Sequence, residues 1–226
     1  PAILAEGGAA AISPLQCGIT LPKINTLVAT TSIQGVTGYR FRVTNMTDLT
    51  GPNQVQTVTR SLNWFTLQML TRYNYGTTYQ IEVAVKTTGD FGGYGSPCEI
   101  SSPPAPSLIN CAATIATNTS LISCTSLAGV TQYRFQVTRD SDGASTTIDR
   151  SNNYFTYSNV PAAIQTPGVL YNVRVAVMTA GTWSPYGDVC QITSPGAPAA
   201  KAESAVAETM VDFKAVACPN PFNADF

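Results

Sequence analysis

Apolar and polar residues alternate along several short stretches of the chain. Residues 39–44 (YRFRVT) place three apolar side chains on one side of an extended segment and polar side chains on the other. Residues 79–85 and 171–177 follow the same period of two. This period is typical of a β-strand with one buried face. No stretch keeps the 3.6-residue period of an amphipathic helix beyond a turn or two, so the sequence predicts an all-β fold.

The strand patterns belong to an internal repeat. Residues 39–44 return 94 positions later as residues 133–138, and residues 60–66 return as residues 150–156. The other matching pairs are residues 79–85 and 171–177, Cys17 and Cys111, Tyr94-Gly95 and Tyr186-Gly187, and Cys98 and Cys190. Each repeat holds about seven short strands separated by Gly-rich turns, which favours a two-sheet sandwich. We therefore expect two tandem immunoglobulin- or fibronectin type III-like β-sandwiches, plus the beginning of a third small β domain.

The repeat also sets the expected boundaries. They are residues 1–16 (a linker or the end of a preceding module), 17–103 (module 1), 104–110 (a linker), 111–198 (module 2), 199–212 (a linker) and 213–226 (the start of the third domain). Tyr79 and Tyr171 open the penultimate strand of each module, where a tyrosine corner anchors the preceding loop. The chain opens without the basic start and apolar stretch of a secretory signal peptide, so we expect it to be the C-terminal part of a longer precursor.

Composition argues against several functions. Charged residues make up 11% of the chain, against about 25% in a typical soluble domain, and the net charge is −1. A near-neutral surface argues against nucleic acid binding, which needs clustered Lys and Arg. No apolar run approaches the roughly 20 residues that a transmembrane helix needs. The chain has no His, which removes Ser-His-Asp and Cys-His pairs and imidazole metal sites.

Three groups of side chains are candidates for a site. Asp140, Asp142 and Gly143 look like the start of a calcium loop, but the rest of the EF-hand motif is absent, and a hairpin turn is favoured. Loop aromatics can stack on sugar rings, although packing over the end of the sandwich is favoured. These loop aromatics are Phe91, Tyr94, Trp183 and Tyr186. The strand arginines, interpreted as solvent-facing, are Arg40, Arg42, Arg134 and Arg174. No carboxylate pair has glycosidase spacing, so we expect no catalytic, metal or cofactor site.

The repeat resembles the fibronectin type III-like modules of proteins exported by the type IX secretion system. The resemblance covers both repeats and rests on the Cys17-Gly18 start, the Tyr-x-Phe-x-Val and Tyr-x-Val-x-Val strands and the Tyr-Gly-x-x-Cys close. Module 2 departs at Cys111-Ala112, a change expected to matter little. The resemblance implies an extracellular, cell-surface location and a non-catalytic stalk or adhesion role, as in adhesins and gliding-motility proteins.

The tail resembles the beginning of a type A C-terminal sorting domain of the same system. The residues that carry this resemblance are Pro219, Asn220, Pro221 and Phe222. Cys218 stands where an aromatic residue is common, and the chain stops at Phe226, so the domain is truncated. The resemblance implies three partners, namely the outer-membrane translocon, its shuttle protein and the sortase that attaches a lipopolysaccharide anchor. The plainer interpretation of the motif is a Pro-rich turn.

Two other functions stay open at this point. The modules can be accessory parts of a secreted hydrolase whose catalytic domain lies upstream, or they can bind a surface glycan or a protein themselves.

Six cysteines without a CxxC pair favour disulfides in an oxidising compartment over a zinc site. The repeat leaves one partner for each cysteine in module 1 and transfers the same bond to module 2. The expected pairs are Cys17–Cys98, Cys111–Cys190 and, for the two that remain, Cys124–Cys218. A competing pattern joins Cys111 to Cys124 and Cys190 to Cys218, and the sequence does not decide between the two.

Overall fold

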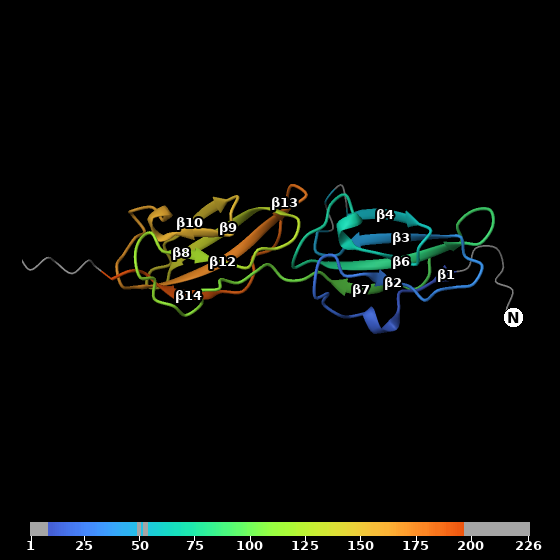
Figure 1. The fold of residues 1–226 in the computed structure, drawn as a ribbon, viewed down its shortest axis with the longest axis horizontal. Helices are drawn as coiled ribbons and strands as arrows, with labels where there is room; N and C mark the ends of the chain where they lie inside the picture. Colours follow the sequence, from blue (N-terminus) through green and yellow to red (C-terminus); the bar gives the residue numbers. More distant parts are fainter. Residues whose placement is uncertain (1–8, 49–50, 52–53, 197–226) are drawn as a thin grey trace, which may run out of the picture. The chain divides into compact units, whose positions relative to one another are not determined.

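The chain folds into β-sandwich modules, as seen in a computed structural model that describes residues 9–48, 51 and 54–196 (Figure 1). The described residues up to Gly196 form one compact unit that contains both modules. The predicted all-β class is confirmed. The expected linker at residues 199–212 and the expected start of a third domain at 213–226 lie outside the described residues.

Module 1 is a two-sheet sandwich. Its elements are β1 (Ala9–Ala10), η1 (Pro14–Gln16), β2 (Val28–Ala29), β3 (Gly38–Asn45), β4 (Val55–Arg60), β5 (Trp64–Phe65), η2 (Leu67–Met69), β6 (Thr78–Lys86) and β7 (Cys98–Ser101). The larger sheet has the order β1-β6-β3-β4, and β7 also pairs with β6. The smaller sheet pairs β2 with β5. Because β4 pairs with β3, the turn between them is a hairpin within the larger sheet.

Module 2 repeats this plan. Its elements are β8 (Leu121–Ser123), β9 (Val130–Arg139), β10 (Ser145–Arg150), β11 (Tyr154–Thr156), η3 (Tyr157–Asn159), β12 (Leu170–Thr179), β13 (Thr182–Trp183) and β14 (Cys190–Thr193). The larger sheet has the order β10-β9-β12-β13 with β14 paired to β12, and β8 pairs with β11. Even the register is conserved between the modules, since Phe41 lies opposite Val83 and Phe135 lies opposite Val175.

A pair of phenylalanine rings joins the two sheets of each module. Phe41 and Phe65 have ring centroids 4.8 Å apart, and Phe135 and Phe155 have ring centroids 4.9 Å apart. All four side chains are buried. One ring of each pair comes from the larger sheet and one from the smaller, so each pair holds the sandwich together across its middle. Contacts of this kind are worth about 3–5 kcal/mol per ring on truncation to alanine.

The first strand of each module begins earlier than the sequence indicates. In module 1, β1 pairs with β6, and Ile12 then forms a bridge to the segment after β2 in the other sheet. In module 2, Leu108 is buried and forms the equivalent bridge to the segment after β8. Residues 1–16, expected as a linker or the end of a preceding module, thus include β1, and residues 104–110, expected as a linker, include the bridging Leu108. Their short Ala- and Pro-rich sequences lack the alternation that reveals a strand.

Candidate functional site

Two disulfides close the modules at their last strands. Cys17–Cys98 and Cys111–Cys190 each have a Cα–Cα distance of 5.3 Å, and they are the pairs that the repeat predicts. The competing Cys111–Cys124 pairing is therefore wrong. Cys124 is instead a free thiol buried in the core of module 2, and burial raises its pKa to about 12. The other member of the expected Cys124–Cys218 pair lies outside the described residues.

The residue after the first cysteine of each disulfide has a left-handed backbone. Gly18 has a φ of 77° and Ala112 a φ of 61°. The amide of each donates a 2.7 Å hydrogen bond to the last strand, at the carbonyl oxygens of Glu99 and Gln191 respectively. The change from glycine to alanine therefore keeps the geometry. It still costs about 1–2 kcal/mol, because the left-handed region is unfavourable for an L-residue.

Both predicted tyrosine corners are confirmed. The Tyr79 hydroxyl accepts a 2.8 Å hydrogen bond from the Asn74 amide, five residues upstream. The Tyr171 hydroxyl accepts from the Thr166 amide at 2.9 Å and donates to the Ile164 carbonyl at 2.6 Å. Both tyrosines are buried, so each loop before the penultimate strand is attached to the core.

The aromatic loop residues of module 1 cover arginines on the outer face of the larger sheet. The guanidinium carbon of Arg40 lies 4.0 Å from the ring centroid of Phe91, and that of Arg42 lies 4.1 Å from the ring centroid of Tyr94. Arg42 also forms a bidentate ion pair with Glu82 at 2.6–2.7 Å, and this hydrogen bonding raises the pKa of Arg42. The sequence favours a position of these rings over the end of the sandwich. The structure places them instead against arginines on the outer face of the larger sheet.

Module 2 builds one corresponding stack. The guanidinium carbon of Arg134 lies 4.0 Å from the ring centroid of Trp183, and Arg134 forms two 2.8 Å hydrogen bonds with Asp149. Tyr186 is 37% exposed, and Arg174 is exposed as expected. Sequence reasoning missed these stacks because it treated the arginines and the rings as separate groups. Arginine–aromatic contacts of this kind are worth about 0.5–1 kcal/mol at exposed sites.

The Asp-rich candidate loop is a hairpin turn. Gly143, with a φ of 73°, lies between β9 and β10 and donates its amide hydrogen to the Arg139 carbonyl. The Asp142 carboxylate accepts hydrogen bonds from Arg139 at 2.5 and 2.9 Å, which lowers the pKa of Asp142 to about 2. The favoured turn interpretation is confirmed.

Residues of the two modules form partly buried hydrogen bonds with one another. Thr179 is fully buried, and its hydroxyl donates to the Tyr73 carbonyl at 2.6 Å. The side-chain amide of Asn74 donates to the Trp183 carbonyl at 2.8 Å, and the Tyr75 hydroxyl donates to the Ala128 carbonyl at 2.9 Å. We call these three bonds the module joint.

A glycine makes the module joint sterically feasible. Gly129 has a φ of 74°, and a Cβ atom at this position would collide with the Tyr73 hydroxyl. The preceding residue, Ala128, is the one that accepts the hydrogen bond from Tyr75. Because Gly129 has no Cβ atom, Tyr73 and Tyr75 of module 1 can lie close to this turn of module 2.

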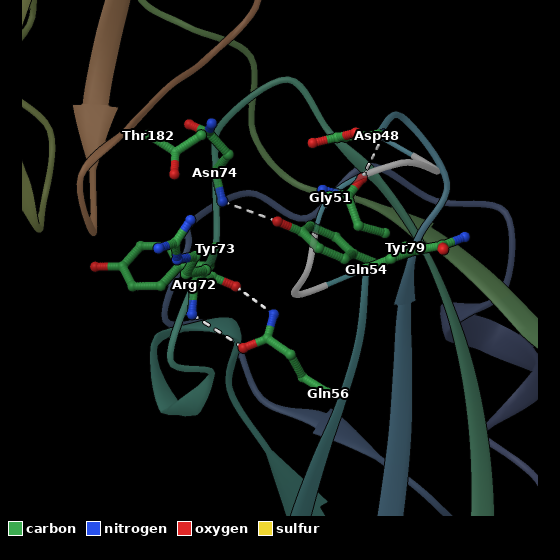
Figure 2. A pocket seen from close by; sticks show the side chains of 10 residues that line it. Asp48, Gly51, Gln54, Gln56, Arg72, Tyr73, Asn74, Tyr79 and Thr182 are labelled. Carbon is green, nitrogen blue, oxygen red and sulfur yellow. Dashed lines mark hydrogen bonds between the residues drawn. The ribbon is translucent and has the colours of Figure 1, made fainter.

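A small polar cavity of about 70 Å³ lies beside the module joint (Figure 2). Its lining includes Asn74, Tyr79 and Thr182. On one side, the Gln56 side chain forms two hydrogen bonds with the backbone of Arg72, at 2.7 and 3.0 Å. A volume of this size has room for one or two water molecules rather than for an organic substrate.

Within residues 9–48, 51 and 54–196, no three or more His, Cys, Asp or Glu side chains group as a metal site. In the same ranges, no helix has the length and apolar character of a membrane span.

Similar folds occur among solved structures. A two-domain segment of chicken tenascin is 14% identical, has a TM-score of 0.41, and the match covers 84% of this chain and 99% of that one. The FN1–FN3 domains of chicken CNTN1 are 12% identical, have a TM-score of 0.31, and the match covers 83% and 67%. Both are fibronectin type III structures. No protein-family model and no curated protein matches the chain. The description of each module as a β-sandwich rests on its strand pairing.

Proposed function

We propose that the chain is a non-catalytic spacer and adhesion segment of a secreted cell-surface protein. The module joint is the observation that carries this proposal. Module 1 ends its last strand at Ser101, and the buried Ala105 lies with its carbonyl oxygen beside Gly187 of module 2, so only a few residues lie between the sandwiches. A short connection with hydrogen bonds between the sandwiches suits a segment that holds other parts of a protein at a fixed distance.

The joint can be tested by removing its side-chain donors. In an Asn74→Ala/Thr179→Val variant, the partly buried carbonyl oxygens of Trp183 and Tyr73 lose their partners, which costs about 0.5–1.5 kcal/mol for each hydrogen bond. We expect the two modules of the native protein to share one rotational correlation time in ¹⁵N relaxation measurements, and those of the variant to differ. Thr87→Val, at the equivalent position of module 1, is the control. Different correlation times in the native protein would contradict the spacer role.

We also propose that the tail directs export through the type IX secretion system and surface anchoring, with the translocon, shuttle protein and sortase as partners. The support is the Pro219–Phe222 motif together with the kind of module that precedes it. Two disulfides agree with an extracellular location, because such bonds persist in oxidising compartments. An adhesin or a gliding-motility protein would use such a tail to be exported and anchored at the cell surface.

Export is tested with a reporter fused to residues 199–226, followed by the rest of a type A sorting domain from a known cargo. We expect secretion by a host with type IX machinery. Changing Pro219, Asn220, Pro221 and Phe222 to alanine should leave the reporter in the periplasm, whereas alanines at residues 203–206 in the same tail should not. Undiminished export of the motif variant would refute the assignment.

A further inference from the structure

A shallow hollow lies on module 1 beside the Phe91–Arg40 stack. Gly38, Lys86 and Phe91 line it, together with Thr37, Thr59 and Arg60. Gly38 lies opposite Lys86 on β6, and Arg40 lies opposite Thr59 on β4. Residues paired in this way project from the same side of a sheet. The hollow therefore opens on the outer face, where Phe91 packs against the backbone of Gly38.

Two cations, Arg40 and Lys86, lie on the outer face beside the hollow and form no ion pair within the described residues. In the described part of the chain the ion pairs are those of Arg42, Arg134 and Arg139. Arg40, Arg60 and Lys86 take part in none of them. Arg60 lies opposite the buried Tyr39, and its guanidinium stacks on Trp64 and donates to the Trp64 carbonyl, so its charge lies on the other side of the sheet from Arg40 and Lys86. The carboxylates nearest to Lys86 in sequence are those of Glu82, which pairs with Arg42, and Asp90, an exposed loop residue that takes part in none of these ion pairs.

Module 2 offers an internal comparison, because it contains the same stack in a neutral form. Asp149 lies opposite Arg134, where module 1 has Thr59 opposite Arg40. Gln132 lies opposite Met178, where module 1 has Gly38 opposite Lys86. Module 2 thus supplies a carboxylate for its arginine, a longer side chain in place of glycine and no lysine. The fold accommodates both forms, so the open, cationic form in module 1 is not a requirement of the sandwich.

We propose that the hollow of module 1 binds an anionic saccharide, a sugar chain that carries carboxylate or sulfate groups. Phe91 supplies an apolar surface for a sugar ring, and the exposed hydroxyls of Thr37 and Thr59 can hydrogen-bond to sugar hydroxyls. Arg40 and Lys86 attract the anionic group, the arginine with bidentate geometry. A shallow, open site suits a polymer that passes over the face. An acidic peptide would satisfy the cations but would leave the ring without a specific role.

The proposal rests on the adhesion role proposed above and names its ligand class. It is tested by titrating the full chain with a short oligogalacturonate, followed by NMR chemical shifts. The neutral probe is the methyl-esterified oligosaccharide, and the peptide probe is poly-L-glutamate. Of the three probes, we expect only the oligogalacturonate to bind saturably, with chemical-shift changes around Phe91. Its binding should weaken as the salt concentration rises towards 0.15 M, because charges more than about 8 Å apart are then largely screened.

Three variants separate the parts of the site. Phe91→Ala and Lys86→Met should each weaken binding by about three- to tenfold, and Thr59→Asp, which installs the carboxylate found in module 2, should do the same. Lys23→Met, the same charge change at an exposed position elsewhere on module 1, should leave affinity unchanged. Denaturation midpoints check that each variant folds; Thr59 is exposed, so its variant keeps the test valid if Phe91→Ala unfolds.

The outcomes distinguish this proposal from the spacer role. Absence of oligogalacturonate binding overturns the saccharide site and leaves the module joint and the export tail untouched. Equal binding of poly-L-glutamate, together with no effect of Phe91→Ala, shows a surface that attracts any anion and also overturns it. Different correlation times for the two modules, in contrast, overturn the spacer role without affecting the hollow.

Discussion

Loss of either disulfide is expected to lower the free energy of unfolding of its module by about 4–5 kcal/mol. The bonds span 81 and 79 residues, and the entropy lost by the unfolded chain on closing loops of this length corresponds to about 4.5 kcal/mol. Small domains have only about 5–15 kcal/mol of total stability, so each module without its bond approaches the unfolding threshold. Urea denaturation of a Cys17→Ala/Cys98→Ala variant and of a Cys111→Ala/Cys190→Ala variant measures the loss.

The buried thiol provides the control for this prediction. Cys124→Ala removes a sulfur atom from the core but no cross-link, so we expect a smaller loss of about 1 kcal/mol. The native thiol should also react slowly with a disulfide reagent at pH 8, because its pKa of about 12 keeps it protonated and the core shields it. An unchanged denaturation midpoint in both double variants would contradict the first expectation, and rapid labelling of Cys124 the second.

Tyr171→Phe should destabilise module 2 by about 2–3 kcal/mol, more than Tyr79→Phe destabilises module 1. The Tyr171 hydroxyl bonds to the Thr166 amide, to the Ile164 carbonyl and, at 3.0 Å, to the Tyr157 hydroxyl, which is also buried. Each of the three groups keeps another partner, namely Arg139 for the Ile164 carbonyl, the Tyr157 hydroxyl for the Thr166 amide and the Thr166 carbonyl for the Tyr157 hydroxyl. The expected loss is therefore that of three hydrogen bonds, at about 0.5–1.5 kcal/mol each. At Tyr79 one amide bond is lost, so about 1 kcal/mol is expected.

Denaturation of the single variants separates these effects. Tyr154→Phe is the matched control in module 2, because Tyr154 is 37% exposed and its hydroxyl accepts only a 3.3 Å hydrogen bond from Asn152. We expect its stability to stay within about 0.5 kcal/mol of the native value. Equal losses for Tyr154→Phe and Tyr171→Phe would show that the hydrogen bonds of the corner do not stabilise the fold.

The sequence predicts the features of this protein that depend on local pattern and on repetition. Alternating residues such as those of 39–44 predict half-buried strands, and the structure places Phe41 fully inside. The repeat predicts the two disulfides and the two tyrosine corners, because a contact needed in one copy is needed in the other. These predictions require no knowledge of which distant residues meet.

The features that the sequence does not predict depend on such distant meetings. Asn74 and Trp183 are 109 positions apart, and no pattern marks either as part of a joint. The pairing of Arg134 with Trp183 depends on the path of the loop after β12. The complete burial of Cys124 in the core of module 2 depends on packing with distant residues, and a count of cysteines does not predict it. The first strands are missed because alanine and proline carry little amphipathic signal.

The two disulfides determine how far this chain can stretch under a pulling force. Tension applied at the two ends of module 1 passes from Cys17 to Cys98 through the covalent bond, so the residues between them carry no load. An extended chain spans about 3.3–3.6 Å per residue. The disulfide therefore prevents a loop of 81 residues, roughly 270–290 Å when extended, from adding to the length of the stretched chain. Module 2 withholds a similar length over 79 residues. Even a module whose sheets have come apart would lengthen little, and the tether would stay nearly inextensible until a bond is reduced.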